Sequence, residues 1–132
     1  MLGKVLLSID AVGLAVGAVV ADMNETHMYN PRWPPHAKFH NAQTITLAAI
    51  LGLLTLFFTW RKCTNPQIRR DSTKVAMIFG SIYWIAGCCA QLFPGADGLD
   101  PEFGGPGFPQ LKIFLFFLGC GVSGGVFELS GL

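Results

Sequence analysis

The sequence predicts an all-α integral membrane protein, a four-helix bundle that forms a single transmembrane domain over residues 1–132. Hydrophobic residues make up 52% of the chain and charged residues only 13%, whereas an ordinary soluble domain carries about 25% charged residues. The charges are also clustered, which leaves long apolar runs between them. The net charge of +1 gives no electrostatic reason to expect nucleic-acid binding.

Four apolar segments approach the length of about 20 residues that an α-helix needs to cross about 30 Å of hydrocarbon. None alternates like a barrel strand, and a helix satisfies its own backbone hydrogen bonds in lipid. The predicted helices are 2–21, 42–60, 75–93 and 111–129. Close helix packing is predicted at the glycines of the first and fourth segments, which are Gly13, Gly17, Gly119, Gly121, Gly124 and Gly125.

Basic residues predict the orientation in the membrane. Five lysines and arginines lie in or beside the link 61–74, so the positive-inside rule places this link and both termini in the cytosol. The loops 22–40 and 94–110 then face the lumen or exterior, and in a eukaryotic cell we expect the endoplasmic reticulum. In an alternative interpretation the first segment is a signal peptide cleaved after Ala21, which would leave three spans.

Polar residues are concentrated between residues 22 and 44, a stretch that contains all three histidines of the chain. Two consecutive prolines predict that a helix begins near Pro35, because proline fits the first helical turn. The spacing then puts four polar residues on one face of this helix, namely His36, His40, Gln43 and Thr44. A polar face that enters a membrane is expected to point at the bundle or at a wet cavity.

This stretch predicts an acid/base site. Imidazole gives and takes protons near neutral pH, and a neighbouring carboxylate can orient it or act as its partner. A short connection brings the end of the first helix to the start of the second. The predicted catalytic residues are Asp22, Glu25, His27, His36 and His40. The predicted substrate-binding residues are Asn24, Tyr29, Trp33, Phe39, Asn41 and Gln43, with Asp10 at the floor of the pocket.

Other interpretations of these residues remain open. Two histidines four apart on a helix can bind zinc or iron, but the glutamate of the zinc-protease motif is missing, and we expect no metal. The histidines and aromatic residues can also form an interfacial belt without chemistry. Asp10 is either a proton relay or a neutral interhelical hydrogen-bonding group, with Ser8, Ser81 or Gln91 as the expected partner. The four cysteines lack zinc-site spacing and are predicted to be structural.

The strings NETH (24–27) and NPRWPPHAKFHNAQ (30–43) resemble a family of small four-helix membrane proteins of fungi and bacteria. The size and layout are similar to those of small fungal membrane-bound enzymes that act as epoxide hydrolases, cyclases or isomerases in polyketide and terpenoid pathways, and more distantly to those of the small membrane sterol isomerases. The resemblance implies an enzyme of a natural-product pathway. No glycine-rich loop or basic cradle indicates a nucleotide cofactor, and we expect no cofactor.

The sequence therefore predicts a membrane-embedded acid/base enzyme, either a hydrolase/cyclase or an isomerase. Its expected substrate is a lipophilic polyketide or terpenoid intermediate, which it would convert by epoxide opening or double-bond isomerisation. Membrane lipid and other enzymes of the same pathway are the expected partners. The alternative is a non-catalytic membrane protein that binds a lipid or docks a pathway enzyme.

Overall fold

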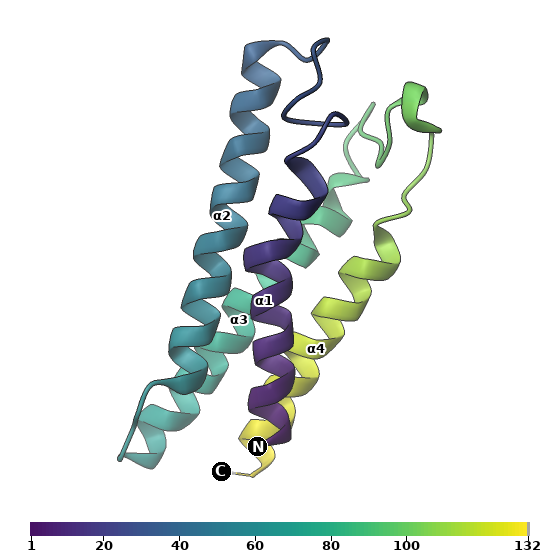
Figure 1. Cartoon of the computed structure of the whole chain (residues 1–132). Helices are drawn as coiled ribbons and strands as arrows, with labels where there is room; N and C mark the ends of the chain where they lie inside the picture. The colour runs from purple at the N-terminus through teal and green to yellow at the C-terminus, as the bar shows by residue number, and fades with distance from the viewer. Residues whose placement is uncertain (132) are drawn as a thin grey trace.

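The computed structural model describes residues 1–131, and its four long helices run side by side in an up-and-down arrangement (Figure 1). They are α1 (Leu2–Asp22), α2 (Pro35–Trp60), α3 (Pro66–Ala90) and α4 (Leu111–Ser130), with a short 3-10 turn, η1 (Pro101–Phe103). Each long helix packs against its neighbours in the chain, and α4 closes the bundle against α1. No strand occurs within residues 1–131, and the predicted all-α bundle is confirmed.

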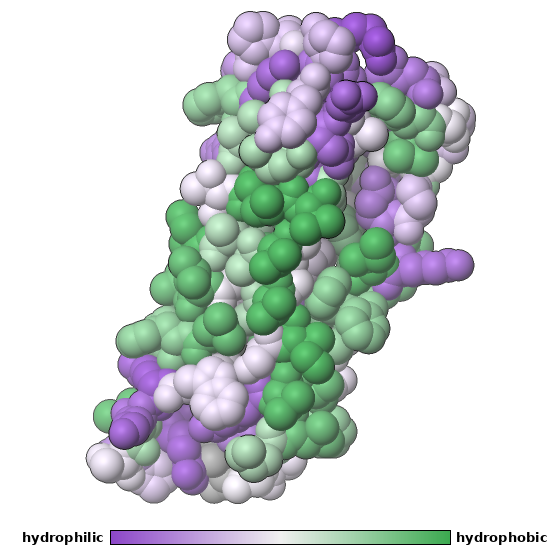
Figure 2. Space-filling view, viewed as in Figure 1, coloured by the Kyte–Doolittle hydropathy of each residue, from purple (hydrophilic) through white to green (hydrophobic). Residues whose placement is uncertain are grey.

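The two ends of the bundle differ in chemistry. The loops 23–34 and 91–110 lie at one end, which we call the histidine end. The link 61–65, the start of α1 and the end of α4 lie at the other end, which we call the basic end (Figure 1). A hydrophobic band separates the two polar ends (Figure 2). All four long helices are long and apolar enough to cross a membrane, which indicates a multi-pass membrane protein.

Helix α3 is displaced toward the N-terminus relative to the predicted span of 75–93. It begins at Pro66 because the Asn65 side chain caps it, accepting from the backbone N–H groups of Gln67 (2.8 Å) and Ile68 (3.3 Å). It ends at Ala90 because Pro94 disfavours a helical conformation at residue 93. Its first two turns are charged and extend beyond the apolar run. Helix α2 begins at Pro35, where the proline pair predicts a helix start, and this is seven residues before the predicted apolar span of 42–60.

Close helix contact occurs at four of the six predicted glycines, namely Gly13, Gly121, Gly124 and Gly125, and also at Gly3 and Gly52. A Cβ on Gly3 would lie 2.5 Å from the carbonyl oxygen of Gly124, so α1 and α4 meet backbone to backbone at the basic end. A Cβ on Gly52 would lie 2.6 Å from the carbonyl oxygen of Ala11, which brings α2 equally close to α1. By contrast, Gly17 and Gly119 face open space, and the prediction that they pack against a neighbouring helix is wrong.

Candidate active site

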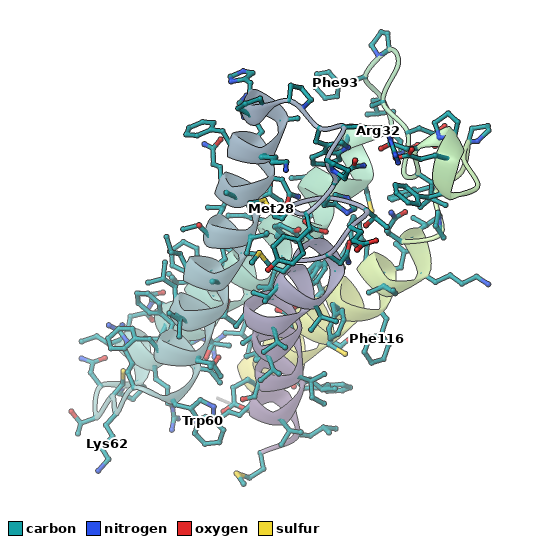
Figure 3. The ribbon with its side chains drawn as sticks, turned by 45° about the horizontal axis from the view of Figure 1, so that its top comes forward. Met28, Arg32, Trp60, Lys62, Phe93 and Phe116 are labelled. Atoms are coloured by element: carbon teal, nitrogen blue, oxygen red, sulfur yellow. The ribbon has the colours of Figure 1, made fainter. Side chains whose placement is uncertain are left out.

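The loop 23–34 is held in place by the loop 91–110. The buried Asn30 (1% exposed) donates to Glu102 Oε1 at 3.1 Å and accepts from the Arg32 backbone N–H at 2.9 Å. Arg32 and Glu102 form an ion pair across the two loops (Figure 3). The hydrogen bond from the guanidinium holds the pKa of the Glu102 carboxyl below its usual range. Trp33 Nε1 points toward Asp100 Oδ2 at 3.4 Å. These contacts give the NPRW motif a structural role.

A chain of side chains then fixes the orientation of His27. The Asn24 side-chain N–H donates to the Ala21 carbonyl at 2.6 Å, so Asn24 Oδ1 faces the other way as an acceptor. This oxygen accepts from the Thr26 backbone N–H (2.8 Å) and from the Thr26 hydroxyl (2.6 Å). Thr26 Oγ1 also lies 2.7 Å from His27 Nδ1. The proton of the Thr26 hydroxyl points to Asn24 Oδ1. The proton in the contact between Thr26 Oγ1 and His27 Nδ1 is therefore the one on Nδ1.

The other nitrogen of His27 faces a carboxylate. Nε2 lies 3.9 Å from Asp22 Oδ1, and Asp22 Oδ2 accepts from the Asn41 side chain at 2.9 Å. With the proton on Nδ1, a neutral imidazole would present the Nε2 lone pair to an ionised carboxylate. The separation of 3.9 Å is longer than a hydrogen bond, so the two groups face each other without a direct bond. The ring of Trp33 packs against the imidazole edge to face, with centroids 5.1 Å apart.

Asn41 extends the site next to the Asp22–His27 pair. Its side-chain N–H donates to Asp22, and its Oδ1 is buried with no hydrogen-bond partner.

His36 and His40 lie on the outside of the bundle. His36 Nε2 is 3.1 Å from His40 Nε2, and Phe39 stacks on His36 with ring centroids 6.2 Å apart. His40 Nδ1 also contacts Gln43 Oε1 at 3.4 Å. All four side chains are exposed, so the expectation that this face points at the bundle is wrong. The physical reason is that α2 packs through the opposite face, where Gly52 meets α1.

The structure thus divides the predicted cluster. It brings together Asp22, His27, Asn24, Asn41 and Trp33. Glu25 and Tyr29 are exposed at the same end. Within residues 1–131, no three His, Cys, Asp or Glu side chains converge on a point where a metal ion would fit.

Asp10 belongs to the bundle core and not to the histidine end. It is 12 residues before Asp22, about 18 Å along the axis of α1. Its carboxyl is fully buried and accepts from Trp84 Nε1 at 2.6 Å, while Oδ2 has no partner. Trp84 replaces the expected partners Ser8, Ser81 and Gln91. Two glycines leave room for this carboxyl, Gly80 on α3 and Gly121 on α4.

An open apolar groove of about 700 Å³ runs along the outer face of α1. Valines and Ile9 of α1 form its floor, from Val5 near the basic end to Val20 near the histidine end. Phe116 and Phe117 of α4 form one wall, and Trp60 closes the basic end (Figure 3). The lining of the groove is almost entirely apolar.

A protein-family model matches residues 6–127, and it is described as a family of unknown function, DUF6640. The match covers most of the chain, and the protein belongs to this family. No curated protein and no solved structure matches the chain at a significant level.

Proposed function

We propose that the protein is a membrane-embedded, cofactor-independent acid/base enzyme in which Asp22 and His27 move the proton. The observation that carries this proposal is the oriented chain from Asn24 through Thr26 and His27 to Asp22. It places an imidazole nitrogen 3.9 Å from a carboxylate oxygen at the same end of the bundle. The His27 side chain is 31% exposed and that of Asp22 15% exposed, so a substrate can reach the pair without a rearrangement of the helices.

A pair that holds one proton can give it up and accept another. In epoxide opening, the proton passes to the epoxide oxygen as its C–O bond breaks. The vacated base then takes a proton from the water or internal hydroxyl that forms the new C–O bond. In double-bond isomerisation, the proton adds to one alkene carbon and the base removes a proton from the allylic carbon. In either reaction, the Asn41 N–H would hold the Asp22 carboxylate in place.

The substrate class follows from the setting of the site. The pair lies at the end of an apolar bundle, which favours a lipophilic intermediate, such as a polyketide or terpenoid, that partitions into the membrane. The basic end would face the cytosol under the positive-inside rule, and the histidine end the lumen or exterior. In a eukaryotic cell we assign the protein to the endoplasmic reticulum. Enzymes that supply the substrate and consume the product would be its partners.

The experiment is a deletion of the gene followed by complementation and metabolite profiling. We expect one lipophilic intermediate to accumulate on deletion and to disappear with the wild-type chain. His27→Gln should restore less than about 1% of the conversion, since acid/base groups contribute about 10²–10⁴-fold. His40→Gln is the matched control, because it removes a histidine outside the pair, and it should restore conversion. Full conversion by His27→Gln would refute the proposal.

The apolar groove along α1 favours a second candidate, a non-catalytic protein that binds a lipid or docks a pathway enzyme. This candidate predicts that no metabolite changes on deletion. It also predicts that replacement of Asp22 or His27 leaves lipid binding unaltered.

A further inference from the structure

We propose that the basic end binds a phosphorylated lipid, with the phosphate group in a basic pocket and one hydrocarbon chain in the groove along α1. This binding site is at the opposite end of the bundle from Asp22 and His27. It does not depend on proton transfer at the histidine end.

The pocket has a volume of about 290 Å³ and lies between the end of α2, the link 61–65 and the start of α3. One carboxylate lines it, that of Glu128, which contacts the amino group of Met1 at 3.8 Å. Within residues 1–131, none of the cations of the pocket forms an ion pair with a carboxylate. The cationic side chains that line the pocket are Lys4, Arg61, Lys62 and Arg69. The pocket therefore carries an excess of positive charge that an anion would neutralise.

Arg61 is held in an orientation suited to a phosphate. Its Nε donates to Ser72 Oγ at 2.6 Å, and its guanidinium carbon lies 4.8 Å from the centroid of the Phe58 ring. Ser72 is buried (3% exposed) and donates in turn to the Ile68 carbonyl at 2.7 Å. The two terminal nitrogens of Arg61 remain available as a planar pair of donors, which matches two phosphate oxygens. Because the side chain is already ordered, binding would cost little conformational entropy.

The positive-inside rule explains why the link is basic but does not explain why its charges converge. Lys4 is on α1, outside the link, and its ammonium lies 5.2 Å from the centroid of the Trp60 ring. This contact brings a charge from the first helix to the same pocket. Trp60 and Lys62 both extend from the basic end (Figure 3). In a bundle that spans the membrane, the pocket would lie at the depth of lipid headgroups, where basic pockets bind anionic lipids.

Trp60 separates the pocket from the apolar groove, because it lines both. Its Nε1 donates to Ser8 Oγ at 2.9 Å, which fixes the indole between the two. From Val5 to Val20 the groove follows about 22 Å of helix, more than half of the roughly 30 Å hydrocarbon layer. A lipid whose phosphate occupies the pocket can thus lay a whole acyl chain along α1. This continuity favours a lipid over a soluble phosphate.

Native mass spectrometry of the purified full chain in detergent micelles tests the ligand class. We expect phosphatidic acid to bind with one molecule per chain. Oleic acid, which has a similar chain and a carboxylate in place of the phosphate, should bind at least tenfold more weakly. Inorganic phosphate should also bind at least tenfold more weakly, because it does not occupy the groove. Equal binding of oleic acid would overturn the phosphate assignment, and equal affinity for inorganic phosphate would overturn the lipid assignment.

Variants test the two halves of the site separately. Arg61→Gln and Arg69→Gln should weaken phosphatidic acid binding by about tenfold or more, the effect of a lost charged hydrogen bond. Arg70→Gln removes the same charge from a residue that does not line the pocket, and it should bind as the wild type does. Equal weakening by Arg69→Gln and Arg70→Gln would refute the pocket in favour of a diffuse basic surface.

Gly17→Leu tests the groove. Gly17 lines the groove and has open space around it, so a leucine would fill the groove without disturbing the helices. We expect at least tenfold weaker binding of phosphatidic acid and unchanged binding of inorganic phosphate. Unchanged binding of phosphatidic acid would contradict the assignment of the chain to this groove.

Discussion

Replacement of Gly80 by alanine tests how the bundle accommodates a buried carboxyl group. Gly80 lies on α3 opposite Asp10 of α1, and a Cβ at this position would overlap Asp10 Oδ2. The same Cβ would lie 3.3 Å from Asp10 Cγ and 3.5 Å from Thr55 Cγ2. The carboxyl therefore has to rotate. Rotation breaks the 2.6 Å hydrogen bond from Trp84 Nε1, which links α3 to α1 in the core.

The cost can be worked out from three contributions. A lost buried hydrogen bond costs about 1–3 kcal/mol, and the overpacking of a filled core costs about 1–3 kcal/mol. Alanine has a higher helix propensity than glycine, and this offsets about 1 kcal/mol of the destabilisation. We expect Gly80→Ala to lower the free energy of unfolding by about 1–5 kcal/mol. The largest part of this loss depends on the presence of the Asp10 carboxyl.

Equilibrium unfolding in mixed micelles, followed by tryptophan fluorescence and circular dichroism, measures the effect. Gly119→Ala is the control, because this helical glycine faces open space, and it should be neutral or slightly stabilising. In an Asp10→Ala background the carboxyl is gone, so Gly80→Ala should cost less than about 1 kcal/mol there. An equal loss in both backgrounds would refute the reasoning, as would a Gly80→Ala protein as stable as the wild type.

Two further predictions concern the loops. Arg32 lowers the pKa of Glu102 in the folded protein, so the stabilisation from this carboxylate is present at neutral pH and lost as the pH falls through the lowered pKa. The difference in thermal midpoint between the wild type and Glu102→Gln should therefore shrink from pH 7 to pH 3, and a constant difference would contradict the ion pair. Asn65→Ala removes the acceptor for two N–H groups at the start of α3 and should cost about 0.5–2 kcal/mol in unfolding. An unchanged stability would argue against the cap.

The sequence was sufficient to predict the four helices, because apolar length is a strong and local signal. The positions at which the helices begin and end outside the hydrocarbon layer depend on weaker signals in the sequence. The Asn65–Pro66 pair marks the true start of α3 and could have been identified as a capping signal. The span predicted from hydropathy began later, because the first turns of α3 are charged.

The candidate site was only partly predictable. Spacing along α2 shows that His36 and His40 share a face, but it does not show which face packs against α1. The close approach at Gly52 decides this and turns both histidines outward. The contact between Asp22 and His27 is local in sequence and could be predicted from the short connection. The Asn30–Glu102 contact joins residues 72 apart, and no sequence signal relates them.

The most direct test of the central claim is turnover by isolated membranes that contain each variant at equal abundance. The substrate is the intermediate that accumulates when the gene is deleted, and the readout is its initial rate of conversion. We predict that Asp22→Asn and His27→Gln lower this rate by about 100-fold or more, while His36→Gln and His40→Gln leave it close to that of the wild type. Normal rates with both Asp22→Asn and His27→Gln would contradict the assignment of proton transfer to this pair.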